Sequence, residues 1–234
     1  MRNAIIATIK SFNIANAEKL TKRFPNWNIT LITDKSRLTE ATLASVNPEY
    51  VFFPHWSWII PADIYTKTEC VVFHMTDLPF GRGGSPMQNL IVRKIYETKI
   101  AALRAEKGMD TGPVYLKRDL DISTGSANEI LSRVSDVIFN DMIPAFLNAE
   151  KHLAPRPQQG ATTVFSRRTP QDSDMRSAAM QTTQDLYDFV RMLDGEGYPP
   201  AFIKAGRLKL ILKNAERHGT KITGTFEAVE NDCE

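Results

Sequence analysis

Residues 50–74 read YVFFPHWSWIIPADIYTKTECVVFH and contain two short apolar runs that flank a short helical segment. The runs are YVFF at residues 50–53 and CVVF at residues 70–73, and neither alternates polar with apolar side chains. Unbroken apolar runs of this length are typical of strands that are buried on both faces of a parallel sheet. Residues 61–65 between them are expected to form a helical turn, so the segment predicts one βαβ unit.

The same rhythm is present upstream of this segment. We expect strands at residues 3–9 and 27–33, and helices at residues 15–24 and 37–46. Together with the βαβ unit, these elements predict an α/β fold with a doubly wound, Rossmann-like, mostly parallel sheet. The GxGxxG motif is absent after the first strand, and its absence disfavours a nicotinamide cofactor.

The pattern downstream of residue 84 mixes helices with strands. Ser85 and Pro86 are typical of the N-cap and the first position of a helix. The elements expected here are helices at residues 85–97, 126–152 and 183–193, and strands at residues 99–104, 113–118 and 161–165.

The segment APRPQQG at residues 154–160 is expected to be an extended connector, because it has two prolines among polar residues. We therefore expect a catalytic domain at residues 1–153 and a small β-rich C-terminal α+β segment at residues 154–234. A β-hairpin of residues 208–212 and 221–226 is expected near the end of that segment. The final residues, VENDCE, are expected to be disordered.

Composition and charge narrow the function classes. The 234 residues include 42% hydrophobic side chains, which suffices for a full core, and 29 Lys and Arg against 27 Asp and Glu. Such an even balance argues against a dedicated nucleic-acid binder. No apolar stretch reaches 18 residues and no signal peptide is evident, so a cytoplasmic protein without a membrane span is expected. The two cysteines have no metal-ligand spacing, and Cys70 is expected to be a buried apolar residue.

The stretch FHMTDLPFGRGGSPMQN, at residues 73–89, has the composition of a ligand-binding loop. His74 follows an apolar strand, and the carboxyl ends of parallel strands are where such sheets bind ligands. Glycines in the loop allow backbone N–H groups to approach a ligand, and Arg82 suits a phosphate or a carboxylate. The alternative is an ordinary turn, in which the glycines serve geometry and Arg82 is solvated.

Asp110 lies in a second turn, GMDTG at residues 108–112, between two expected strands. Asp is common in turns for conformational reasons alone. The competing interpretation is a carboxylate held beside His74, because a His and an Asp at adjacent strand ends can orient each other and share a proton.

These motifs resemble those of the N10-formyltetrahydrofolate-dependent formyltransferases. The pattern HxxxLPxxRG at residues 74–83 and the DTG at residues 110–112 match that family's two signature segments. Residues 55–64, 160–172 and 186–202 also resemble family segments, most closely those of methionyl-tRNA and sugar formyltransferases. The resemblance implies a formyltransferase with a Rossmann-like catalytic domain, N10-formyltetrahydrofolate as co-substrate and no metal.

The resemblance also implies roles for individual residues. His74 and Asp110 would be catalytic, with His74 donating to the oxyanion or toward N10 and Asp110 orienting it. The folate-binding residues would be Trp58, Ile59, Ile60, Arg104, Lys107, Gly108 and Asp110. The residues on the acceptor side would be Thr76, Arg82, Gly83, Gln88 and Tyr198.

One departure from the family pattern concerns the residue two positions before His74. The family has Asn there, and this chain has Val72. An Asn would supply a second donor to the oxyanion, whose loss typically costs about 10²–10³ in rate. We therefore expect another group to replace it, such as Gln88, Asn89, a backbone N–H or a water.

The acceptor expected from the resemblance is an amino sugar linked to UDP, dTDP or GDP, for polysaccharide biosynthesis such as that of the lipopolysaccharide O-antigen. The even charge and the short C-terminal part, 80 residues from position 155 onward, argue against a methionyl-tRNA formyltransferase, which remains an alternative. A non-catalytic nucleotide-sugar or folate-binding module also remains open, because of Val72. The resemblance implies a homodimer, with neither nucleic acid nor membrane as partner.

Overall fold

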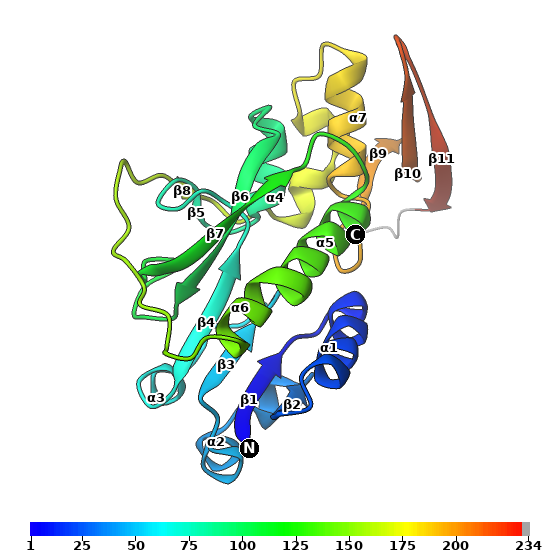
Figure 1. Cartoon of the computed structure of the whole chain (residues 1–234). Coiled ribbons are helices and arrows are strands. Elements are labelled where there is room, and N and C mark those ends of the chain that lie inside the picture. The colour runs from blue at the N-terminus through cyan, green and yellow to red at the C-terminus, as the bar shows by residue number, and fades with distance from the viewer. Residues whose placement is uncertain (231–234) are drawn as a thin grey trace. The chain divides into compact units, whose positions relative to one another are not determined.

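The computed structural model describes residues 1–230 (Figure 1). Contacts divide the chain into two compact units, which are described separately. The domain border expected at residue 153 remains a prediction. The first unit comprises residues 1–83, 98–120 and 132–164, and the second comprises residues 84–97, 121–131 and those from 165 onward.

A six-stranded sheet with the order β2-β1-β3-β4-β6-β7 belongs largely to the first unit. Strands β1 to β4 run parallel to one another, and β6 is antiparallel to its neighbour β4. The chain moves outward from β1 to β2 and then returns to place β3 on the other side of β1, so the sheet is doubly wound, as predicted. Its strands are β1 (Arg2–Ala7), β2 (Trp27–Ile32), β3 (Tyr50–Phe53), β4 (Glu69–His74), β6 (Glu97–Arg104) and β7 (Val114–Asp121).

Helices cover both faces of this sheet. The rings of Tyr50 and Phe52 pack against Phe146 of α6, with centroids 5.5 and 5.4 Å apart. Val51 and Phe53 point to the opposite face, where they share a core with residues of α2 and α3. The apolar run of β3 is therefore buried on both sides. The helices of the first unit include α1 (Ser11–Arg23), the 3-10 turn η1 (Lys35–Arg37), α2 (Glu40–Val46), α3 (Ala62–Tyr65) and α6 (Ile143–Leu147).

The long helix expected at residues 126–152 is a continuous helical segment that ends earlier, at Leu147. It consists of α5 (Ala127–Val137), the π-helical turn η2 (Ile138–Met142) and α6. Pro144 lacks a backbone N–H, and the wider π-helical turn directly precedes it. At its start the Ser126 backbone N–H donates to the Glu129 carboxylate, and the Glu129 N–H donates to the Ser126 hydroxyl, as in a capping box.

The second unit contains a three-stranded antiparallel sheet with the order β11-β10-β9. The expected hairpin is present but longer than expected, and the first strand of this sheet was not predicted. Val229 and Glu230 lie in β11, so the expected disorder is wrong for them, and 231–234 lie outside the described residues. The elements are α4 (Pro86–Val92), the 3-10 turns η3 (Pro170–Ser173) and η4 (Met175–Ser177), α7 (Thr183–Arg191), β9 (Ala201–Ala205), β10 (Leu208–His218) and β11 (Lys221–Glu230).

Helix α4 is shorter than the helix expected at residues 85–97. Ser85 precedes it, but its side chain makes no capping hydrogen bond within the helix and instead accepts one from the Arg168 backbone N–H. The helix ends before Lys94, which has a positive φ of 59°. Within residues 1–230 no helix is long and apolar enough to cross a membrane.

Candidate active site

His74 is the last residue of β4 and is nearly buried, with 7% of its surface exposed. Its Nε2 lies 2.8 Å from the carbonyl oxygen of Gly81. A carbonyl oxygen only accepts, so Nε2 carries a proton and donates it. The hydroxyl of the buried Thr76 donates to the same oxygen at 3.3 Å. Residues at the end of β4 thus fix the glycine loop that follows it.

Asp110 lies in the turn between β6 and β7 and faces His74. One of its carboxylate oxygens, Oδ2, is 3.5 Å from His74 Nδ1 and accepts a 2.9 Å hydrogen bond from the Gly83 backbone N–H. Asp110 has a φ of +54°, a left-handed conformation that costs energy for a residue other than glycine. The structure therefore brings together the His, the Asp and the glycine loop that the sequence predicted as a site.

The two nitrogens of His74 are in different surroundings. Nε2 is bonded to a carbonyl, whereas Nδ1 faces a carboxylate within 3.5 Å. With a proton on Nε2, the Nδ1 of the neutral ring keeps the lone pair that can accept a proton. This pair can therefore take up a proton from a reacting group, which is a general-base role.

A residue that the sequence analysis did not single out, Gln158, connects Arg82 with the Asp110 turn. The Gln158 Oε1 accepts from Arg82 Nε and Nη2, at 3.1 and 2.7 Å. The Gln158 Nε2 donates to the carbonyl oxygens of Asp110 and Gly112, both at 2.8 Å. The sequence indicated only an extended connector here, and no local pattern marks which of its polar residues turns inward.

Two further features hold the loop and the turn in place. Lys117 donates from Nζ to Asp77 Oδ1 and to the Leu78 carbonyl oxygen. Gly112 passes so close to the Arg104 carbonyl oxygen that a Cβ at this position would lie 1.9 Å from it. The DTG motif thus needs its glycine for steric reasons.

Several residues predicted to bind folate lie in the same unit as the pair. Trp58 and Ile59 are exposed, at 38% and 89%, whereas Ile60 packs against the apolar core. Lys107 and Gly108 precede Asp110 in its turn. Arg104 is engaged elsewhere, because its Nε lies 2.8 Å from the Glu69 carboxylate.

Gln88 and Tyr198, predicted on the acceptor side, belong to the second unit. Gln88 is buried and donates from Nε2 to the Met192 carbonyl oxygen. Burial raises the pKa of the Tyr198 phenol, and a hydrogen bond with Gln88 opposes this shift. Asn89 donates from its side chain to three backbone carbonyls. The amide donors of Gln88 and Asn89 are thus engaged with backbone, which argues against either as the replacement for the missing Asn.

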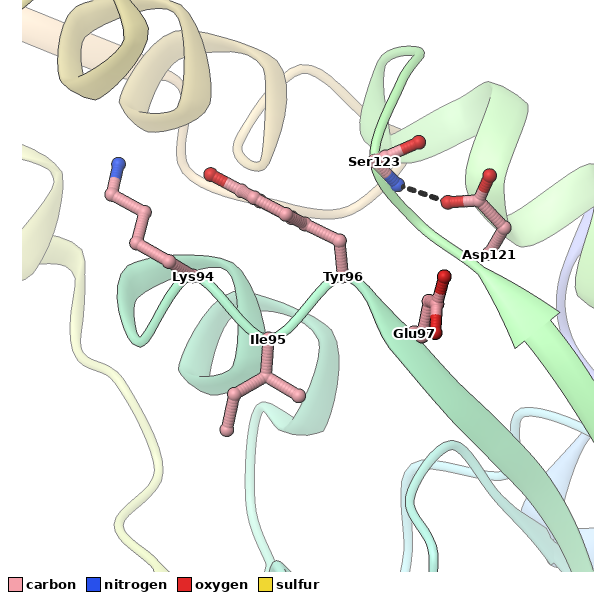
Figure 2. A pocket seen from close by; sticks show the side chains of 6 residues that line it. All are labelled: Lys94, Ile95, Tyr96, Glu97, Asp121 and Ser123. Carbon is pink, nitrogen blue, oxygen red and sulfur yellow. Dashed lines mark hydrogen bonds between the residues drawn. The ribbon is translucent and has the colours of Figure 1, made fainter.

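A shallow cavity of about 470 Å³ lies in the second unit (Figure 2). The cavity is lined by Lys94, Ile95, Tyr96, Glu97, Asp121 and Ser123. None of these residues was predicted to belong to the site. Asp188 accepts from the hydroxyl of Tyr96 at 2.6 Å and from Lys94 at 3.1 Å, and it pairs with the buried Arg191. Burial raises the pKa of Asp188, but its hydrogen bonds and the Arg191 charge outweigh it and hold the pKa below the usual range.

Within the described part of the chain, no group of three His, Cys, Asp or Glu side chains gathers as metal ligands would. Burial raises the pKa of the Cys70 thiol to about 12, so this cysteine stays protonated near neutral pH. The candidate chemistry in the first unit therefore centres on His74 and Asp110.

Known proteins resemble this chain in sequence and in structure. The model of the family "Methionyl-tRNA formyltransferase, C-terminal domain" matches residues 170–229. A curated methionyl-tRNA formyltransferase of Campylobacter jejuni is 23% identical over 190 residues, which are 80% of this chain and 60% of the relative. The chain thus spans about 60% of the length of the curated relatives it matches first.

Solved structures extend the likeness over the whole chain. A sugar N-formyltransferase from a Shewanella species is 15% identical, covers 100% of this chain and 98% of its own, and superposes with a TM-score of 0.63, which shows the fold. A structure described as methionyl-tRNA formyltransferase from Clostridium thermocellum is 50% identical, with a TM-score of 0.94, over 99% of this chain and 100% of that one. At that identity and coverage, this chain belongs to the formyltransferase family.

Proposed function

We propose that this chain transfers the formyl group of N10-formyltetrahydrofolate to the amino group of methionyl-tRNA. The observation that supports formyl transfer most directly is the His74–Asp110 pair at the carboxyl end of β4, with 3.5 Å between Nδ1 and Oδ2. The choice of acceptor is supported by the names of the relatives, above all the one that is 50% identical over the full chain.

The proposed chemistry assigns proton transfer to this pair. A neutral amine attacks the formyl carbon, a C–N bond forms, and a tetrahedral intermediate carries the negative charge on oxygen. The pair accepts the proton that the amine loses, with His74 receiving it and Asp110 stabilising the resulting cation. The bond between the formyl carbon and N10 then breaks, and a proton returns to N10. Tetrahydrofolate and the formylated amine are the products.

The second unit offers cationic side chains to an RNA acceptor. Residues 201–230 contain six Lys or Arg and three Glu, a local excess that the balanced total conceals. Lys209 is paired opposite Lys204 of β9, and Lys213 lies four residues further along β10, on the same face. Phosphates are bound mainly by such side chains. The even total charge therefore does not exclude a nucleic-acid partner, because this part of the chain carries a local excess of positive charge.

The nucleotide-linked amino sugar expected from the sequence is the second candidate acceptor. Arg82 favours it, because its guanidinium, which Gln158 links to the Asp110 turn, suits a diphosphate. The two candidates differ in their dependence on salt. Binding to RNA weakens steeply as salt rises, in proportion to the number of phosphates contacted, whereas a diphosphate offers few such contacts.

The test supplies purified protein with N10-formyltetrahydrofolate and either initiator methionyl-tRNA or a panel of UDP-, dTDP- and GDP-linked amino sugars. Formylated product is separated by chromatography and quantified. We expect formylmethionyl-tRNA to form, and His74→Ala to lower its rate by about 10²–10⁴. The matched control is His152→Ala, which changes an exposed histidine that pairs with Glu49. Product only from a sugar would overturn the tRNA acceptor, and full activity of His74→Ala would overturn the mechanism.

A further inference from the structure

Gln158 closes a ring of hydrogen bonds that includes Asp110, one member of the candidate catalytic pair. Its side chain bonds Arg82 on one side and the carbonyl oxygens of Asp110 and Gly112 on the other. The Asp110 carboxylate in turn accepts from the N–H of Gly83, the residue that follows Arg82. Gln158 therefore links the two segments that the sequence motifs mark, and both amide atoms of its side chain are engaged.

Asp110 needs such support because of its backbone conformation. Asp reaches a φ of +54° more readily than most residues other than glycine, but still at a cost of up to about 1–3 kcal/mol. The Asp110 carbonyl is tied to Gln158 and its carboxylate to Gly83, so both ends of the residue are anchored. Without the Gln158 donor, the turn can relax and its carboxylate can move away from His74.

We propose that Gln158 is a positioning residue that keeps the Asp110 carboxylate within reach of His74 Nδ1 for proton transfer. It acts through Asp110 and through Arg82 rather than on the reacting atoms. The expected effect of Gln158 on kcat rests on the proposed function. Its effect on the position of the Asp110 carboxylate can be measured without substrate.

The amide hydrogen of Gly83 reports the position of Asp110 directly. Its hydrogen bond goes to the Asp110 carboxylate, so the rate at which it exchanges with solvent measures how firmly that carboxylate is held. Asp110→Ala removes the acceptor and gives the exchange rate of the unprotected amide. This measurement uses the free protein and does not depend on which acceptor it formylates.

The test variant is Gln158→Glu, which keeps an acceptor for Arg82 but turns the donor to Asp110 and Gly112 into a second carboxylate oxygen. That oxygen repels the two carbonyls, so the turn is displaced while the contact with Arg82 remains. The matched control is Gln159→Glu, which places the same charge on the exposed neighbouring residue. Urea denaturation of both variants separates a local effect from a loss of overall stability.

We expect Gln158→Glu to accelerate Gly83 exchange by on the order of tenfold or more relative to Gln159→Glu, because a charge-assisted hydrogen bond is lost. We also expect kcat to fall by about 10², the usual effect of misplacing a catalytic group by about 1 Å, with KM for the folate little changed. Unchanged Gly83 exchange, or faster exchange with unchanged kcat, would overturn the proposal. Faster exchange in a protein whose wild type formylates neither acceptor would instead overturn the proposed function.

Discussion

Lowering the pH from 7.5 to 5.0 should destabilise this protein through one histidine outside the candidate site. His55 follows β3, and its Nδ1 lies 2.9 Å from the amide nitrogen of Asn13. That nitrogen also donates to Thr8 Oγ1 and to the Pro54 carbonyl, at 2.9 and 3.2 Å, which fixes its orientation. Nδ1 must therefore accept, and a proton on it would meet another donor. Burial first, and then the charge of Lys10, lower the pKa of His55 to about 4.

The sign and size of the effect follow from linkage. The unfolded chain has a histidine pKa near 6.5, so between pH 6.5 and about 4 the unfolded state binds more protons than the folded state. The stabilising contribution of neutral His55 is complete above pH 6.5, falls as the pH falls, and levels off below pH 4. It amounts to about 2 kcal/mol at pH 5 and about 3 kcal/mol in total.

The assay is urea denaturation at pH 7.5 and pH 5.0, for the wild type and for His55→Asn. Asn tolerates the positive φ of 52° at this position and does not titrate. We expect the difference in unfolding free energy between the two pH values to be about 2 kcal/mol smaller in His55→Asn than in the wild type. His152→Ala, at an exposed site, serves as the control. Equal pH dependence of His55→Asn and the wild type would refute the reasoning.

Three other changes have defined outcomes. His74→Ala should lower kcat by about 10²–10⁴, because it removes a proton acceptor; a steady-state assay checks this. Gly112→Ala should destabilise the fold by at least about 2 kcal/mol, because the new Cβ would meet the Arg104 carbonyl oxygen at 1.9 Å; thermal unfolding measures the loss. Arg191→Met should cost about 3 kcal/mol in urea denaturation, since it leaves the buried Asp188 carboxylate without its closest cation. An unchanged midpoint would show that the remaining partners of Asp188, Tyr96 and Lys94 among them, suffice for it.

The parallel half of the fold was predictable because strands that are buried on both faces have unbroken apolar sequences. The runs at residues 50–53 and 70–73 are apolar throughout, and they form β3 and most of β4. Strand β9 has no such signal, because AFIKA is only five residues long and directly follows two prolines. The early end of the helix at Leu147 was equally hidden, since the apolar spacing weakens only gradually there.

The candidate site was predictable only in part for a similar reason. His74 and Asp110 stand in motifs whose glycines and flanking strands indicate a turn at a sheet edge, and the structure places the two side chains 3.5 Å apart. Gln158 contributes through contacts with residues 46 to 76 positions away in the chain. No local periodicity encodes partners at that separation. Only the folded chain shows that Gln158, and not the adjacent Gln159, bonds the backbone of the Asp110 turn.

The structure shows which contacts Val72 makes at the position where the family has an Asn. Val72 is two residues before His74 on β4, so both side chains lie on the same face of the sheet. There Val72 packs against Leu78 and Leu103, beneath the loop that carries Arg82. The site thus gains apolar packing where the family has a polar donor. Under the proposed function, His74 Nε2 is already bonded to a carbonyl, so a developing oxyanion would be stabilised by a backbone N–H, a water or charge on the His74 ring. We then expect rigid placement of the proton-accepting pair to carry a larger share of the rate, so the anchoring of the Asp110 turn would matter more here than where a two-donor oxyanion site is complete.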